Sequence, residues 1–161
     1  MVTKTKRTRS DSVSSAVKAM SNAALPLLQP PKHVKITPNA KPYWEGVILS
    51  RARDEWTEVD LVVAAQLAQC QADMADEDQE LRKQGRVTEN QRGTPIMNPL
   101  TTVMEQLARR EMALMRALRI GGRVAGDPRD QDGKRKLEKE FRKVRGDIAQ
   151  ENQDEEDLLP T

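Results

Sequence analysis

The chain is poor in aromatic residues, with two Trp, one Tyr and one Phe among 161 residues. Charged residues make up 32% of it, so a single copy has little apolar surface to bury in a core of its own. A large self-sufficient globular core is therefore excluded. A helical chain with so thin a core is expected to gain stability by associating with further copies.

Cysteine and histidine occur once each, as Cys70 and His33. A single cysteine excludes an internal disulfide, and we expect Cys70 to be a small buried hydrophobe in a reducing compartment. The spacing of these two residues and of the carboxylates fits no metal site, so neither a metal nor a cofactor is expected. The chain has no GxxxxGK[ST] phosphate loop and no nucleophile beside a plausible base. We therefore expect no catalytic residues and no small-molecule substrate.

Long apolar runs are also absent. None approaches the ~20 residues that span a bilayer, and the basic residues near the N-terminus are not followed by an apolar signal core. We expect a soluble, intracellular protein that makes no membrane contact.

The net charge of +2 conceals a segregation of charge along the chain. Residues 1–11 form a basic arm that cannot build a core. Such an arm is usually disordered alone and neutralises phosphates when it meets nucleic acid, although a merely solubilising tail is the alternative. Its candidate DNA-binding residues are Lys4, Lys6, Arg7 and Arg9.

Residues 12–55 are expected to form an N-terminal helical domain that binds DNA. A first helix is predicted from about Ser12 to Ala24, and a second from about Asn39 to Arg53, joined by a stiff basic connector. With the next helix they resemble a helix-turn-helix unit, although a plain three-helix packing domain is the alternative. One narrow helical face of this first segment is marked by the apolar residues Val13, Val17, Met20, Ala24 and Leu27. The candidate DNA-binding residues are Lys32, Lys35, Lys41, Arg51 and Arg53.

Residues 56–122 are expected to form an antiparallel pair of long helices. Thr57 and Asp60 have the spacing of a capping box, which predicts a helix from there to about Gln84. A loop follows, and Asn98-Pro99 is a strong start for a second helix that ends at Gly121-Gly122. Apolar residues recur at the helical period in both, which predicts an oligomerisation core. Its candidate residues are Val59, Val63, Leu67, Leu100, Met104, Leu107, Leu114 and Leu118.

The C-terminal part divides into a basic helical segment at residues 123–150 and a flexible acidic tail at residues 151–161. The helix has a thin apolar stripe and a ladder of basic residues between Lys134 and Arg145. The ladder can line a phosphate track or simply be a solvated face. Its candidate DNA-binding residues are Lys134, Arg135 and Lys136.

The order of these signals resembles the small subunit of tailed-bacteriophage terminases, from residue 44 to residue 122. The residues that carry the resemblance are Trp44, Trp56-Thr57 with Asp60, Leu81, Gly85-Arg86, Gly93, Asn98-Pro99 and Ile120-Gly121. It implies an all-α, non-enzymatic DNA-packaging component that forms a homo-oligomeric ring, often a nonamer, with the paired helices as the ring wall.

The same resemblance implies two partners in the cytoplasm of the infected bacterial host. One is double-stranded phage DNA, bound at the packaging initiation site. The other is the terminase large subunit, which supplies the ATPase and the nuclease. Two further hypotheses remain: a helix-turn-helix transcriptional regulator that dimerises through the long helices, and a structural adaptor whose helices bind protein.

Overall fold

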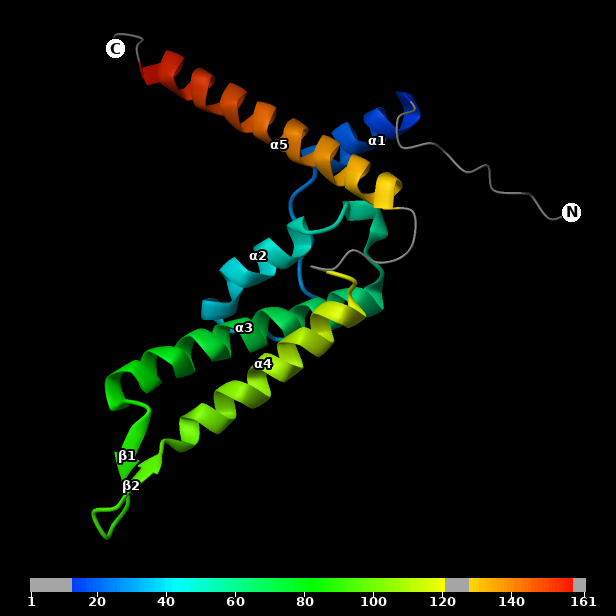
Figure 1. Cartoon of the computed structure of the whole chain (residues 1–161). Helices are drawn as coiled ribbons and strands as arrows, with labels where there is room; N and C mark the ends of the chain where they lie inside the picture. Colours follow the sequence, from blue (N-terminus) through cyan, green and yellow to red (C-terminus); the bar gives the residue numbers. More distant parts are fainter. Residues whose placement is uncertain (1–12, 121–127, 158–161) are drawn as a thin grey trace, which may run out of the picture. The chain divides into compact units, whose positions relative to one another are not determined.

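The structure is a computed structural model that describes residues 13–120 and 128–157 (Figure 1). It confirms the all-α fold class. The helices are α1 (Val13–Ala24), α2 (Lys41–Leu49), α3 (Glu58–Gln84), α4 (Pro99–Ala117) and α5 (Pro128–Asp157). Two 3₁₀ turns are present as well, η1 (Pro38–Ala40) and η2 (Arg53–Glu55), together with the short strands β1 (Val87–Glu89) and β2 (Pro95–Met97).

The contacts divide the chain into two compact units. The first contains α1, η2 and α5, and the second contains η1, α2, α3, the two strands and α4. This differs from the expected grouping of residues 12–55 as one helical domain, because α1 packs against α5 whereas α2 packs against α3. The second predicted helix is also shorter than expected and ends at Leu49, so Arg53 belongs to the separate turn η2.

Local capping fixes where the two long helices begin. Thr57 accepts a hydrogen bond from the Asp60 backbone N–H while Asp60 accepts one from the Thr57 N–H, which confirms the capping box. Asn98 caps α4 by accepting from the Leu100 N–H at 3.0 Å. At both starts a backbone N–H that lacks an intrahelical partner is bonded by a side chain of the same turn. This local cause explains why the sequence predicts these boundaries well.

Helix α3 is the central element of the second unit. It packs against α2, η1 and α4, and Figure 1 shows α4 running back beside it. The small side chains on its buried surface let the neighbouring backbones approach closely. Its buried residues are Ala64, Ala65, Leu67, Ala68, Cys70, Ala72 and Leu81.

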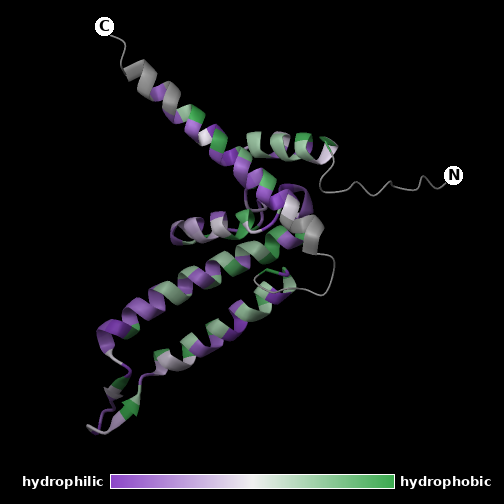
Figure 2. Ribbon diagram, turned by 45° about the horizontal axis from the view of Figure 1, so that its top comes forward, coloured by the Kyte–Doolittle hydropathy of each residue, from purple (hydrophilic) through white to green (hydrophobic). Residues whose placement is uncertain are grey.

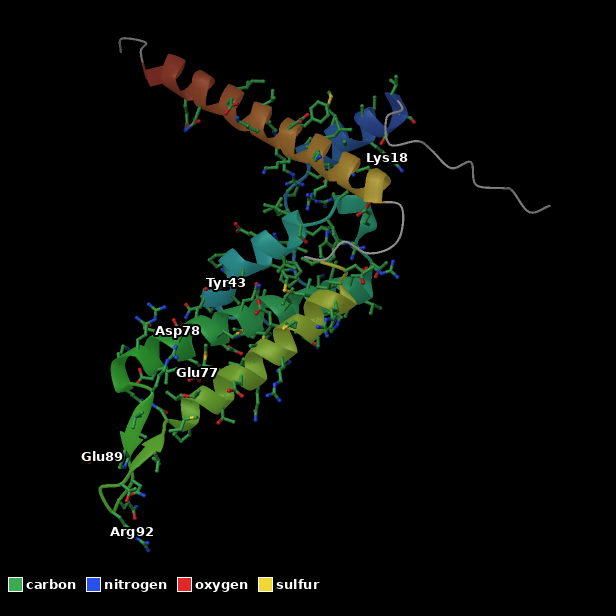
Figure 3. All side chains as sticks on the ribbon, viewed as in Figure 1. Lys18, Tyr43, Glu77, Asp78, Glu89 and Arg92 are labelled. Atoms are coloured by element: carbon green, nitrogen blue, oxygen red, sulfur yellow. The ribbon has the colours of Figure 1, made fainter. Side chains whose placement is uncertain are left out.

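A β-hairpin forms within the segment that was expected to be the loop between the long helices. Strands β1 and β2 pair antiparallel with Val87 opposite Met97. Gly93, near the tip, has a φ of +73°, which a residue with a Cβ adopts only with strain. Figure 3 shows Arg92 at the hairpin tip and Asp78 on the C-terminal half of α3. The sequence did not predict these strands because each has only three residues and no alternating apolar pattern.

Helix α1 packs through a different face from the one that its large apolar residues mark. Its buried residues are Ser15, Ala19 and Ala23, whereas Val13 and Met20 are exposed. Figure 2 shows that α1 is more hydrophobic than α5. The small residues let α1 lie close to α5, and tertiary packing therefore overrides the apolar pattern.

Both C-terminal helix ends differ from expectation. Helix α4 ends at Ala117, before the predicted glycine stop, and Arg119 takes the left-handed conformation at a φ of +56°. The Ile120 N–H then donates to the Met115 carbonyl, which closes the helix end as in a Schellman motif. Helix α5 continues to Asp157, beyond the expected boundary at residue 150, so the start of the expected flexible tail is helical.

Candidate nucleic-acid interface

Glu138 joins three elements of the first unit. Its side chain is only 6% exposed although it lies within the most basic stretch of α5. Both carboxylate oxygens accept from the Arg53 backbone N–H at 3.2 Å, and Oε1 also accepts from Nδ2 of Asn22 at 3.1 Å. Glu138 thus ties α5 to η2 and to α1. This role was not predicted from the sequence, where the available signal was a carboxylate beside the apolar stripe of a basic helix.

Three of the expected DNA-binding cations bond within the first unit. Lys134 pairs with Asp54 at 3.4 Å. Arg53 donates from Nη1 to the Pro26 carbonyl at 2.6 Å, and Arg51 donates from Nη2 to the Glu55 carbonyl at 2.7 Å. These side chains are half-buried, so they stabilise the unit and present less of their charge to a ligand than a fully exposed cation does.

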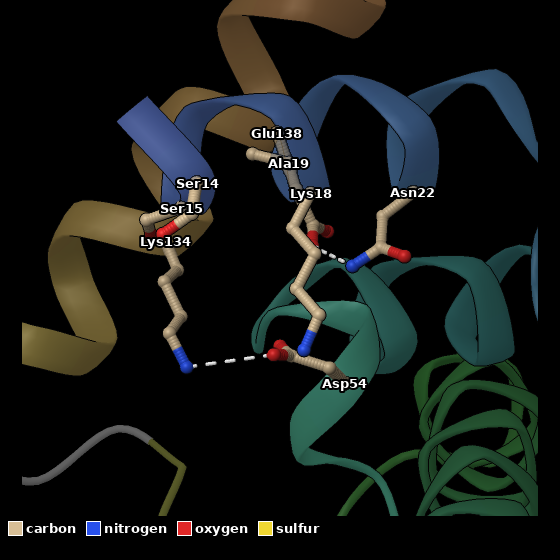
Figure 4. A pocket seen from close by; sticks show the side chains of 8 residues that line it. All are labelled: Ser14, Ser15, Lys18, Ala19, Asn22, Asp54, Lys134 and Glu138. Atoms are coloured by element: carbon tan, nitrogen blue, oxygen red, sulfur yellow. Dashed lines mark hydrogen bonds and ion pairs between the residues drawn. The ribbon is translucent and has the colours of Figure 1, made fainter. Parts of the chain in front are cut away.

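A pocket of about 230 Å³ lies at the same junction, as Figure 4 shows. Lys18 and Lys134 face the carboxylates of Asp54 and Glu138 across it. The charges of its wall balance, which does not favour an anion such as a phosphate. We therefore regard the pocket as part of the packing between α1, η2 and α5.

Glu55 is the acidic group of η2 whose ionisation is perturbed. Its burial raises the pKa of the carboxyl above the ordinary 4.5, and the positive charges of Lys134 and Arg51 oppose that rise. The pKa of Glu55 in the folded protein therefore depends on both its burial and the nearby charges of Lys134 and Arg51.

One side of α5 carries a row of exposed cations. Lys136, Lys139 and Lys143 are exposed, and Arg135 is exposed beside them. The three lysines lie at spacings of three and four residues, which places them along one side of a helix. Of the expected set, Arg135 and Lys136 are exposed next to Lys139 and Lys143, whereas Lys134 pairs with Asp54.

The remaining expected cations lie elsewhere. Lys32, Lys35 and Lys41 are exposed and belong to the second unit. Lys35 also lines a shallow pocket with Arg110 and Asp73. The basic arm with Lys4, Lys6, Arg7 and Arg9 lies outside the described residues.

The expected oligomerisation residues differ in their burial. Leu67 and Leu118 are fully buried within the chain, whereas Val59 is exposed. The other five are half-buried, namely Val63, Leu100, Met104, Leu107 and Leu114. No residue of α4 itself is fully buried, so its packing on α3 leaves part of every side chain accessible.

Cys70 is buried as expected, and its Sγ lies 3.5 Å from the Leu107 carbonyl oxygen. Burial raises the pKa of this thiol, which disfavours the reactive thiolate. Within residues 13–120 and 128–157, no group of three His, Cys, Asp or Glu side chains is arranged to hold a metal ion. None of the helices in that part of the chain has the length and hydropathy that crossing a bilayer requires.

The sequence is similar to those of known proteins. The Hendrixvirinae small terminase family matches residues 1–161. One similar protein is the terminase small subunit of Enterobacteria phage HK97. It is 34% identical over 155 residues, which cover 96% of this chain and 94% of that relative.

Proposed function

Because the chain belongs to the Hendrixvirinae small terminase family and is thus a phage DNA-packaging component, we propose that it assembles into a ring that binds the packaging initiation site of the phage genome. The ring, with nine subunits as the expected number, hands double-stranded DNA to the terminase large subunit and modulates the ATPase and nuclease of that partner. Small terminase subunits are generally non-catalytic. DNA packaging takes place in the cytoplasm of the infected bacterial host.

The charges of the long helices support assembly between copies. The C-terminal half of α3 carries an excess of carboxylates, with Asp76 exposed and Asp78 partly exposed. Helix α4 instead exposes Arg109, Arg110 and Arg116. An acidic α3 surface on one copy therefore complements a basic α4 surface on the next. Contacts between two different surfaces are heterologous, and they generate rings when the rotation closes.

The DNA-binding part of the proposal is carried by one observation, the exposed row of cations on α5. Phosphates attract such a row without regard to base sequence, so each copy contributes a few weak, salt-sensitive contacts. Lys32, Lys35 and Lys41 add cations from the second unit. Repetition around an oligomer multiplies these contacts and converts weak binding into avidity.

The test of DNA binding is the triple substitution Lys136→Gln, Lys139→Gln and Lys143→Gln. We expect weaker binding to duplex DNA, a decrease of up to about 3 in the slope of log K against log [salt], and an unchanged native mass. Arg86→Gln with Arg92→Gln is the control, because these two cations are exposed in the hairpin region and belong neither to the α5 row nor to the proposed contact between α3 and α4. An affinity and a salt slope that the triple substitution leaves unchanged would contradict the role of the α5 row.

Assembly is tested by light scattering after size exclusion. Arg109→Glu with Arg116→Glu should lower the native mass at low salt. Adding Asp76→Lys and Asp78→Lys to the same chain should restore it, because the complementary signs are then exchanged. A native protein that is monomeric or dimeric would contradict the ring.

A further inference from the structure

Helix α1 exposes its large apolar residues to solvent. Val13, Val17 and Met20 are 82%, 62% and 56% exposed, and Ala24 is exposed in the same row. These four residues, the α1 stripe, lie on a different side of the helix from the buried small residues Ser15, Ala19 and Ala23. Their spacing of four, three and four residues is that of the a and d positions of a coiled coil. A helix that packs through one face in its own chain thus has a second face suited to packing.

Helix α5 carries a stripe with the same spacing. It consists of Leu137, Phe141, Val144 and Ile148. The first two residues are half-buried, whereas Val144 and Ile148 are 53% and 51% exposed. The α5 stripe therefore has an open end, and it spans the same number of residues as the α1 stripe.

The α1 stripe and the α5 stripe of one chain cannot pack against each other. Asn22 reaches Glu138, while Arg145 donates to the Ala24 carbonyl oxygen. The two helices of one chain consequently run in the same direction, and their contact uses the small face of α1. Val13 then lies at the opposite end of this contact from Ile148, so only another copy can bring those two residues together.

The charges at the two ends of the chain favour one relative orientation of α1 and α5 in a contact between copies. Residues 1–10, which precede the α1 stripe, contain four basic residues and no acidic one. Residues 147–157, at the far end of α5, contain six acidic residues and no basic one. An antiparallel alignment brings these oppositely charged ends together, whereas a parallel alignment separates them.

We propose that the α1 stripe of one copy packs antiparallel against the α5 stripe of a neighbouring copy, with Val13 facing Ile148 and Val17 facing Val144. This contact rests on the self-assembly that the proposed function requires, and it adds a second interface to the one between α3 and α4. It is heterologous, so it links each subunit to the next around an assembly.

The experiment joins two differently tagged full-length proteins, one carrying Val13→Cys and the other Ile148→Cys. The proteins are mixed under conditions that allow exchange and are then treated with a short bismaleimide. We expect a covalent hybrid of both tags on a denaturing gel. Ala24→Cys mixed with Ile148→Cys is the matched control and should give little hybrid, because Ala24 lies about 16 Å along the helix from Val13. The unsubstituted protein controls for Cys70.

The possible outcomes distinguish a failure of the proposed α1–α5 contact from a failure of oligomerisation. A hybrid from the Ala24 pair and none from the Val13 pair would overturn the antiparallel alignment. No hybrid from either pair, in a protein whose native mass is oligomeric, would overturn the docking and leave the ring intact. A monomeric native mass would overturn both proposals.

A second variant tests whether the stripe itself makes the contact. Val17→Asp with Met20→Asp, in the chain that carries Val13→Cys, should abolish the hybrid with Ile148→Cys. Ser21→Asp is exposed on the same helix outside the α1 stripe and should preserve it. Circular dichroism of each variant shows whether α1 and α5 remain helical. A hybrid that survives the double substitution would overturn the proposal.

Discussion

The Glu138 carboxylate accepts a hydrogen bond from Asn22 Nδ2 at 3.1 Å, although 116 positions separate the two residues in the sequence. The same carboxylate receives the Arg53 N–H through both oxygens. One side chain thereby holds the first and last helices of the described chain against η2. A buried acceptor with charged hydrogen bonds of this kind is costly to remove, because its donors lose their partners.

Glu138→Gln should therefore destabilise the first unit by about 1–3 kcal/mol. The amide keeps the size of the side chain but presents an NH₂ group where one oxygen faces the Arg53 N–H. Urea unfolding at fixed protein concentration, with hydrogen exchange of α1 as a local probe, measures the effect. Glu140→Gln, exposed two residues further along α5, is the control and should leave both readouts unchanged.

Asn98→Ala should reduce stability by about 1–3 kcal/mol, because the side chain has two roles. Its Oδ1 caps α4, and its Nδ2 donates to the Gly85 carbonyl at 3.0 Å, which fixes the end of α3. Asn98→Ser keeps a capping oxygen and removes the amide donor without adding a charge. A serine variant as unstable as the alanine variant in urea unfolding would show that the bond to Gly85, rather than the cap, provides the stability.

Arg119→Gly should stabilise the protein by about 1 kcal/mol. Arg119 has a φ of +56°, in the left-handed region that costs a residue with a Cβ about 1–2 kcal/mol. Gly85, which follows α3, shows that this chain uses glycine at positive φ elsewhere. Arg119→Ala retains the Cβ and should give no gain. Equal melting temperatures for the glycine and alanine variants would contradict the argument from strain.

Glu55→Gln should change how stability depends on pH. Burial raises the pKa of Glu55 in the folded protein, so ionisation of this carboxyl opposes folding. Its favourable contribution is complete below the unfolded pKa and is lost as the pH rises through the raised folded pKa. Relative to the native protein, the glutamine variant should therefore gain stability as the pH rises above the ordinary carboxyl pKa of 4.5. Urea unfolding at several pH values measures the difference, and a difference that does not vary with pH would contradict it.

The starts of the long helices could be predicted because their causes are local. The side chains of Thr57 and Asn98 satisfy backbone groups within three residues of themselves. No distant residue is needed for that, and the all-α class follows from the same short-range signals. The hairpin lacked a comparable signal, because its strands are too short to show a period.

The exposure of the candidate DNA-binding cations could not be predicted, because a cation's sequence position does not reveal its partner. Lys134 and Lys136 are two positions apart, yet one pairs with Asp54 and the other is exposed. Which of the two can meet a phosphate depends on where η2 lies against α5. That contact joins residues 80 positions apart.

The sequence by itself determined the helical class, the capped starts of α3 and α4, and the burial of Cys70. Only the tertiary structure decided that α1 packs through Ser15, Ala19 and Ala23 and leaves Val13 and Val17 exposed. The physical reason is range: capping is completed within one turn, whereas the face that a helix buries depends on the shape of the partner it meets. For α1 that partner is α5, at the other end of the chain.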